Sequence, residues 1–350
     1  QVLKEGEVQG SDVAAHSAGV LDIRTNILAD TDALYLTAID KYGHELWRWT
    51  FPVDKLNQQT EQLSPLSSRP AYTETENELT VKANKRTFIF SKKDGQLKGV
   101  SVDNRKISFA NGPRFIGARR ADRSLDQFYN HDDEKAKEKD RTYSEFPDAA
   151  VFTKLDVKED GGNLVVTANY KLGNLDKAQW TINPSGDLAL DYTYNFSGVV
   201  DLMGIRFDYP EDQVISKRWL GAGPYRVWQN RIHGTQYDVW ENDYNDPIPG
   251  ETFTYPEFKG YFGDVSWMNI QTKEGTISLT NETPDTYIGV YQPRDGRDRL
   301  LYTLPESGIS VLNVIPPVRN KVNSTDLCGP SSQPKWVNGP QTGRVIFRFM

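Results

Sequence analysis

Two antiparallel strands are predicted by one stretch, Val151-Phe-Thr-Lys-Leu-Asp-Val-Lys-Glu-Asp-Gly-Gly-Asn-Leu-Val-Val-Thr-Ala-Asn-Tyr170, and this stretch decides the fold class. Val151, Thr153, Leu155 and Val157 share one face of an extended chain, and the alternation resumes after two glycines. Alternation with a period of two residues, interrupted by a glycine turn, is typical of an antiparallel hairpin.

The same alternation recurs along most of the chain after residue 78. No segment sustains an apolar period of 3.6 residues over three helical turns. We therefore expect an all-β fold, in which residues 78–350 form one large antiparallel sandwich that ends in the strand Arg344-Val-Ile-Phe-Arg-Phe-Met350. The alternating apolar positions are Leu79, Val81, Ala83, Phe88, Phe90, Val100, Val102, Leu164, Val166, Ala168, Tyr170, Trp180, Ile182, Leu188, Leu190, Tyr192, Tyr194 and Phe196.

Residues 1–57 show short strand-like runs that are separated by turn signals. The clearest runs are Val20-Leu-Asp-Ile23, Ala33-Leu-Tyr-Leu-Thr-Ala-Ile39 and Glu45-Leu-Trp-Arg-Trp-Thr-Phe51. Such spacing is typical of an immunoglobulin-like sandwich, which has roughly seven strands. Fewer strands are visible here, so we expect a partial immunoglobulin-like domain whose first strands lie upstream of Gln1.

Two polar stretches interrupt the strand pattern. Residues 58–77 are expected to form a linker between the two domains, because they are polar and include Pro65 and Pro70. Residues 121–147 contain a run of mixed charge, residues 132–141. Their carboxylates, together with His131, lack the spacing of a calcium-binding loop, so we expect a solvated loop there and no metal site.

Charge and cysteine content exclude several classes of function. The chain has 41 basic and 48 acidic residues, a net charge of −7, whereas a nucleic-acid partner calls for a basic surface. The sequence contains no run of 18 apolar residues, the length that a membrane-spanning helix needs, and its first residues lack the pattern of a signal peptide. Because Cys328 is the only cysteine, disulfides do not fix the compartment. We expect the bacterial periplasm or secretion, with the cytoplasm as the alternative.

The sequence offers no self-contained catalytic centre. A hydrolase of the Ser-His-Asp type would show a Gly-x-Ser-x-Gly elbow, and a phosphate-binding protein would show a glycine loop that opens a helix. Neither motif is present, and histidines and cysteines do not occur at metal-ligand spacing. We therefore expect no catalytic residue and no metal ligand in this chain.

Two segments are candidates for ligand binding. The first is Trp219-Leu-Gly-Ala-Gly-Pro-Tyr-Arg-Val-Trp-Gln-Asn-Arg231, in which aromatic rings stand beside arginine and amide side chains, as in sugar sites. Its structural alternative is a tight turn between strands, shaped by glycine and proline, with the tryptophans in the core. The second is Trp336, in a loop before the last strand, which is either a lid on the core or an exposed platform for a sugar ring. The candidate substrate-binding residues are Trp336, Arg226, Trp228, Asn230 and Arg231.

The order of several motifs resembles the C-terminal region of large bacterial β-galactosidases of glycoside hydrolase family 2. Segment 219–231 is similar to the family pattern W-[FL]-G-x-G-P-x-E-x-Y-x-D-R. Other matching parts are Asn77-Glu-Leu-Thr-Val81, Lys92-Lys-Asp-Gly-Gln-Leu97, Gly112-Pro-Arg-Phe115 and the segment from Gly329 to Trp336. The resemblance implies a galactose-mutarotase-like supersandwich, which is the small-chain region of those enzymes.

The same resemblance implies a non-catalytic role. In that family the catalytic glutamates lie in an upstream TIM barrel, and the C-terminal domain contributes a tryptophan to the wall of the sugar site. Trp336 matches that tryptophan. The chain is therefore expected to be part of a retaining β-galactosidase-like hydrolase, inactive alone, with a β-galactoside or related glycan and the rest of its own polypeptide as partners. No cofactor is implied here, since Mg or Na would belong to the absent barrel.

Several positions depart from the family pattern. Gln333-Pro-Lys335 replaces an acidic pair, an Arg-Ala-Pro-x-Asp-Asn motif is missing near Arg119, and Arg226 and Asn230 stand where acidic residues are usual. These departures leave open a related β-glycosidase that acts on a plant or host glycan.

Two further functions remain open. A free-standing carbohydrate-binding module would use Trp336, Trp228 and Trp240 as platforms and would bind sugar unaided. An aldose 1-epimerase on the same fold would need a well-placed histidine and glutamate, and only His131 and His233 are available in the large domain.

Overall fold

The computed structural model describes residues 2–10, 12–24, 31–53, 68–120, 143–243, 259–293, 304–318 and 329–350. The chain divides into two compact units, Gln1–Leu63 and Ser64–Met350. The described residues form strands and two single 3-10 turns, with no α-helix among them, which confirms the all-β prediction. Within this described part, no helix has the length and apolar character needed to cross a membrane.

The first unit contains one antiparallel hairpin, formed by β1 (Ala33–Ile39) and β2 (Glu45–Pro52). Both strands were predicted at these positions. Residues 20–23, by contrast, form no strand, so that prediction was wrong: Val20 is exposed and has no partner strand there. Trp47 and Trp49 lie opposite Ala38 and Leu36 on one apolar face of the hairpin. An immunoglobulin-like domain around the hairpin stays a prediction.

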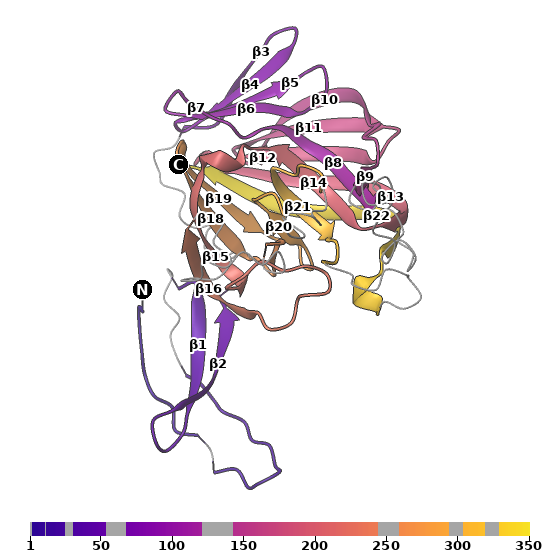
Figure 1. The fold of residues 1–350 in the computed structure, drawn as a ribbon. Helices are drawn as coiled ribbons and strands as arrows, with labels where there is room; N and C mark the ends of the chain where they lie inside the picture. Colours follow the sequence, from indigo (N-terminus) through magenta and orange to yellow (C-terminus); the bar gives the residue numbers. More distant parts are fainter. Residues whose placement is uncertain are drawn as a thin grey trace, which may run out of the picture. The chain divides into compact units, whose positions relative to one another are not determined.

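The second unit contains two large sheets whose strands all pair antiparallel (Figure 1). The nine-stranded sheet has the order β10 (Val151–Asp160), β11 (Asn163–Lys171), β12 (Leu175–Ile182), β13 (Leu188–Val200), β22 (Lys335–Phe349), β19 (Gly275–Asn281), β18 (Trp267–Thr272), β15 (Val214–Gly223) and β16 (Gln236–Asp243).

The eleven-stranded sheet has the order β17 (Phe262–Gly263), β20 (Tyr287–Gly289), β21 (Ile309–Val314), β14 (Leu202–Asp208), β8 (Ala110–Arg120), β6 (Leu97–Val102), β5 (Arg86–Ser91), β4 (Glu78–Ala83) and β3 (Ala71–Glu74). In addition, β7 (Arg105–Ile107) pairs with β6, and β9 (Tyr143–Glu145) pairs with β8. Strand β3 lies within the stretch that was expected to be a linker, so the sheet begins before residue 78.

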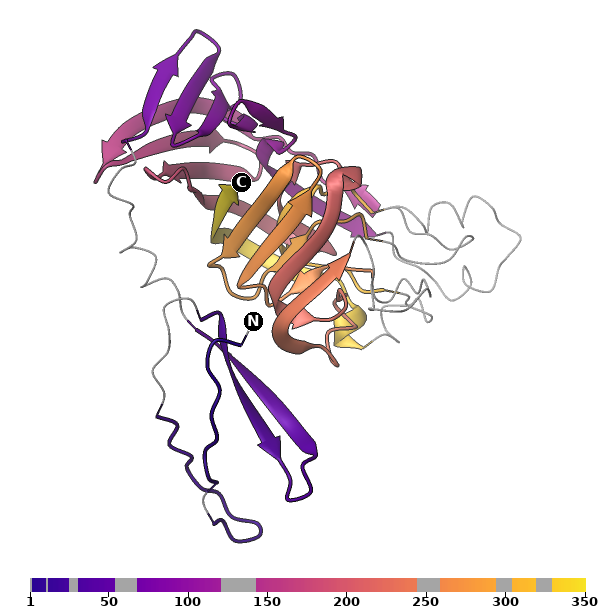
Figure 2. The ribbon, with the colours of Figure 1, turned by 90° about the vertical axis from the view of Figure 1, so that its left-hand side faces the viewer.

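The main core lies between the two sheets. It takes alternate residues from strands of both, as the period-two pattern predicts. Aromatic rings fill much of it: Phe109 stacks on Phe207 at 4.7 Å between ring centroids, and Trp180 meets Phe207 edge-on at 5.9 Å. Figure 2 shows the strands from the side. The expected large antiparallel sandwich is therefore confirmed.

The hairpin that decided the fold class is present, but its first strand carries a bulge. Strands β10 and β11 join at Gly161 and Gly162, which both have positive φ, as the turn requires. The pairing shifts register between Phe152 and Lys154. As a result Phe152 packs against the core while Val151 is exposed, which corrects the expected face at the start of the strand.

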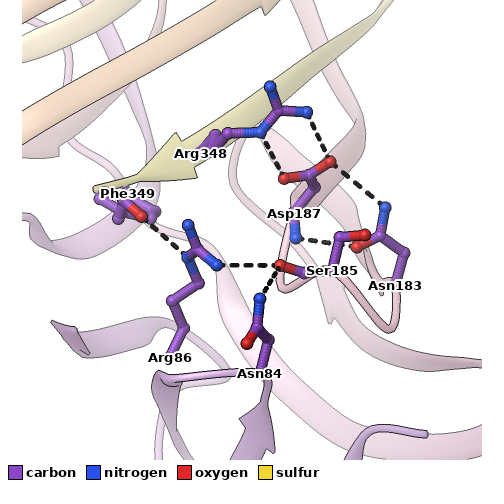
Figure 3. Close-up of polar contacts among 7 residues, drawn as sticks. All are labelled: Asn84, Arg86, Asn183, Ser185, Asp187, Arg348 and Phe349. Atoms are coloured by element: carbon purple, nitrogen blue, oxygen red, sulfur yellow. Dashed lines mark hydrogen bonds and ion pairs between the residues drawn. The ribbon is translucent and has the colours of Figure 1, made fainter. Parts of the chain in front are cut away.

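Polar contacts connect the two sheets at one end of the sandwich (Figure 3). Arg86 of β5 donates to the carbonyl of Phe349 at 2.8 Å and to that of Ser185 at 2.9 Å. Arg348 of β22 donates twice to Asp187, at 2.7 and 2.8 Å. These contacts join the turn before β13 to the last strand and to the facing sheet.

A second, smaller apolar cluster lies on the other face of the eleven-stranded sheet. It includes Ile116 and Leu202 from the strands, and Trp228 and Tyr261 from the segments that cover them. Residues 121–142, which include His131 and most of the predicted solvated loop, and Cys328 lie outside the described residues.

Candidate functional site

Segment 219–231 begins as the end of β15 and continues as a turn. Trp219 is fully buried and donates its indole N–H to the carbonyl of Ala222 at 3.0 Å. Neither Gly221 nor Gly223 has positive φ, so backbone freedom is not the reason for glycine here. The reason is close approach: a Cβ on Gly223 would lie 2.4 Å from Cδ1 of Trp240, and one on Gly221 would lie 3.0 Å from the carbonyl oxygen of Gly263.

Arg226 and Trp228 point into the molecule. The guanidinium of Arg226 lies 5.0 Å from the ring centre of the buried Tyr291. Trp228 is 0% exposed and meets Tyr261 edge-on at 5.9 Å. Burial raises the pKa of the Tyr261 hydroxyl, and the nearby charge of Arg226 offsets only part of that rise. The guanidinium of Arg226 and the ring of Trp228 are therefore both hidden from solvent.

Gln229 and Asn230 connect this turn to two distant segments. The amide of Asn230 donates to the carbonyl of Val318 and accepts from the N–H of Val318, both at 2.8 Å. It also lies 3.5 Å from the hydroxyl of Ser332. Gln229 donates its side-chain N–H to the carbonyl of Gln333 at 2.8 Å. These contacts, which we call the amide lock, hold the 3-10 turn Pro330–Ser332 in place just before Trp336.

Trp336 stands at the start of the last strand, with 71% of its surface exposed. It was expected in a loop before that strand, and this was wrong: β22 begins at Lys335, and Trp336 pairs with Val199 of β13. Gly339 and Pro340 lie within this strand, and the long partner strand carries the ladder through them. Among the described residues, β19 pairs only with the end of β22 from Val345 to Phe349. The half of β22 that contains Trp336 therefore has an unpaired edge, where proline is tolerated.

Arg231 is the exposed end of the candidate segment. Its backbone N–H donates to Trp228 at 2.8 Å, which closes a tight turn, and its guanidinium contacts the carbonyl of Asn230 at 3.2 Å. The structure thus brings Asn230 and Arg231 into one hydrogen-bonded unit with the segment that precedes Trp336. Arg231 and the indole of Trp336 are both exposed, so each is accessible to a ligand.

Sequence reasoning missed the amide lock. Its partners lie 88 to 104 residues apart, and no spacing or periodicity connects them.

The other candidates for chemistry add little. His233 is exposed. In the described ranges, no group of three or more His, Cys, Asp or Glu side chains could hold a metal ion.

The chain matches the model of a known family. The sequence model of the family described as "Beta galactosidase small chain" matches residues 82–315, which is more than half of the chain. No curated protein sequence matches the chain.

Several solved structures are similar in fold. One is a galactose 1-epimerase from Lactobacillus acidophilus NCFM, with 11% identity, a TM-score of 0.40, and coverage of 81% of this chain and 99% of the other. Another is an aldose epimerase homologue from C. elegans, with 8% identity, a TM-score of 0.36, and coverage of 80% and 99%. A copper-containing benzylamine oxidase from Hansenula polymorpha has 7% identity, a TM-score of 0.31, and coverage of 90% and 68%.

Proposed function

The chain belongs to the β-galactosidase small-chain family, and from this premise we propose that it is the non-catalytic, sugar-contacting part of a retaining β-galactosidase-like glycoside hydrolase of family 2. The glutamates that cleave the glycosidic bond would lie in a TIM barrel elsewhere in the polypeptide. This chain would complete the wall of the sugar site, and Trp336 and Arg231 would contact the glycan.

The observation that carries the proposal is the exposure of Trp336 on a rigid support. A tryptophan that served as a lid on the core would be buried, whereas this ring is 71% exposed. It lies on a strand that pairs with β13, and the amide lock fixes the turn before it. Aromatic rings held in this way suit stacking against the apolar face of a sugar, because little conformational freedom is lost on binding.

A free-standing carbohydrate-binding module is the second candidate, and the exposed indole also favours it. Of its three expected platforms, however, Trp228 is fully buried. Trp240 is half-buried, packs over Gly223 and donates its N–H to Gln236 at 3.1 Å. One ring contributes on the order of 1 kcal/mol, so unaided binding would be no tighter than millimolar.

The hairpin of the first unit supports a role within a larger assembly. Trp47, Trp49 and Phe51 are all exposed on one face of β2. Apolar side chains gathered on one sheet face favour a packing partner. We propose that this face belongs to an immunoglobulin-like domain completed by other parts of the polypeptide, located in the periplasm or outside the cell.

Two measurements on the purified chain test the proposal. The chain should not hydrolyse p-nitrophenyl β-galactoside, because the catalytic glutamates are elsewhere; turnover that copurifies with it would contradict the proposal. Calorimetric titration with galactose and lactose should give at most very weak heats. Saturable binding that Trp336→Ala abolishes would favour the free-standing module instead.

A further inference from the structure

Strand β10 forms one edge of the nine-stranded sheet. It pairs with β11 on one side, and among the described residues no strand pairs with its other side. Beyond the bulge at its start, the pairing with β11 is regular from Lys154 to Asp160. An unpaired edge of this length offers a row of backbone N–H and C=O groups to another strand.

The outward face of β10 carries charged side chains of alternating sign. In chain order they are Lys154, Asp156, Lys158 and Asp160. These side chains are between 53% and 68% exposed, whereas Leu155 and Val157 pack against the main core on the opposite face. Each lysine lies beside the aspartate two residues further on, at 2.7 and 3.7 Å. Exposed pairs of this kind contribute little, so the same charges can also meet those of another strand.

The pattern of charges complements itself when two copies of β10 run antiparallel. If Val157 lies opposite Val157 of the second copy, Lys154 faces Asp160 and Lys158 faces Asp156, so every lysine meets an aspartate. Moving one copy by two residues places Asp156 opposite Asp156, or Lys158 opposite Lys158, and like charges in these positions repel. The charges therefore favour one register over its neighbours.

The backbone of β10 supports the same register. Gly161 and Gly162 form a two-residue turn, so the paired residues that flank it, Asp160 and Asn163, direct their backbone groups toward each other. Backbone groups point to alternate sides along an antiparallel strand, so the N–H and C=O of Val157 point to the free edge. Val157 and its copy can therefore exchange two hydrogen bonds.

The other edge of the same sheet carries a different pattern. Native sheets protect free edges with charges that repel a second strand. The charged residues of the edge strand β16 are all acidic, as such protection requires: Asp238, Glu241 and Asp243. A second copy is thus repelled at β16 and attracted at β10.

We propose that β10 pairs antiparallel with β10 of a second copy of this chain, with Val157 at the two-fold axis, so that the nine-stranded sheet continues across a symmetric dimer. This interface goes beyond the sugar contact proposed for Trp336 and uses none of its residues. Because it consists of one strand pair and exposed ion pairs, the dimer is weak, and salt weakens it further.

Sedimentation velocity of the purified chain tests the dimer. With rising protein concentration the chain should pass reversibly from monomer to dimer, and added sodium chloride should shift the equilibrium toward monomer. A chain that stays monomeric up to about 0.5 mM overturns the proposal.

Charge variants distinguish this pairing from other contacts. Lys154→Glu with Lys158→Glu makes the outward face entirely acidic, and Asp156→Lys with Asp160→Lys makes it entirely basic. Each double variant should raise the dissociation constant of the dimer at least about tenfold. An equimolar mixture of the two should form a heterodimer, because every facing pair is again opposite in charge. If the mixture stays monomeric, or if either variant alone dimerises normally, the proposal fails.

The matched control changes the net charge equally on the other sheet. Lys82→Glu with Lys106→Glu alters exposed positions of β4 and β7 and should dimerise as the wild type does. If this control loses the dimer as the acidic β10 variant does, net charge and not the β10 edge governs association, which also overturns the proposal.

Val157→Cys tests the register. In a Cys328→Ser background, it should form a disulfide between copies, since the Cα atoms of paired residues lie about 4.5–5.5 Å apart. Leu155→Cys is the control, because Leu155 of the second copy lies roughly 13 Å further along the neighbouring strand. If Leu155→Cys crosslinks as fast, or if neither variant crosslinks, the assigned pairing is wrong.

Discussion

Asn230 and Val318 exchange two hydrogen bonds, each 2.8 Å long, although they lie 88 residues apart. The pair joins the turn that follows β15 to the segment after β21, and the neighbouring Gln229 extends the connection to Gln333. Much of segment 219–231, which resembles the family pattern, thus supports the exposed Trp336 and does not itself contact sugar.

Asn230→Asp should destabilise the chain. The carboxylate can still accept from the N–H of Val318, but it faces the carbonyl of Val318 without a proton to donate. We expect the free energy of unfolding in urea to fall by about 1–3 kcal/mol. Asn338→Asp is the control, because the side-chain oxygen of Asn338 accepts from Ser197 and a carboxylate can do the same. Equal stabilities of the two variants would show that the amide lock is unimportant.

Gly223→Ala should be destabilising for a steric reason. The added Cβ would lie 2.4 Å from the Trp240 ring, which packs directly over the glycine. Overpacking of this kind costs about 1–3 kcal/mol. Gly99→Ala serves as the comparison, since no atom lies within 4 Å of a Cβ at that position. Thermal unfolding of both variants measures the difference, and a Gly223→Ala protein as stable as Gly99→Ala would refute the close packing.

Acid should weaken the contact between Asp187 and Arg348. Burial alone would raise the pKa of the Asp187 carboxyl, but hydrogen bonds from Arg348 and Asn183 and the charges of Arg348 and Arg86 outweigh it and hold that pKa below its ordinary value of 3.8. The folded state therefore binds this proton less readily than the unfolded state. The stabilisation is complete above the ordinary value and is lost as pH falls through the lower, folded pKa.

The pH dependence of unfolding checks this contact. Between neutral pH and the ordinary pKa of Asp187, the free energy of unfolding should be insensitive to this group, and it should then decline more steeply in the wild type than in Asp187→Asn. Figure 3 shows the hydrogen bonds from Arg348 and Asn183 to the carboxylate that the substitution replaces. Parallel curves for the two proteins would mean that the contact carries no proton linkage.

Trp336→Ala should leave the stability of the chain almost unchanged. Its ring is 71% exposed, so little apolar area is lost on truncation. We expect the free energy of unfolding to change by less than about 0.5 kcal/mol, as for ordinary surface substitutions. Trp180→Ala, at a fully buried position of the main core, is the contrast and should cost about 3–5 kcal/mol. A large loss in Trp336→Ala would indicate a packing role instead.

Alternation in the sequence predicted most strands of the large sandwich because each strand buries one face in the core. Leu79, Val81, Phe88 and Phe90 are all fully buried, as their spacing predicted. The bulge at Phe152 escaped prediction, because a register shift depends on the partner strand and not on the strand itself.

The candidate site was less predictable. The sequence singled out Trp336 and the segment from Trp219 to Arg231, but the pattern could not tell ring faces in the core from ring faces in solvent. The structure buries Trp228 and exposes Trp336. The contacts between the two segments join residues that are far apart in sequence. These residues come together only when the strands of both sheets are in place.

Hydrolysis of p-nitrophenyl β-galactoside by the full-length polypeptide tests the central claim most directly. We predict that Trp336→Ala lowers kcat/KM about three- to tenfold, the equivalent of one lost stacking contact. Trp336→Phe should retain most of the activity, and Lys335→Ala, at the exposed neighbouring position, should retain all of it. An unchanged kcat/KM in Trp336→Ala would contradict the claim that this tryptophan forms part of the sugar site.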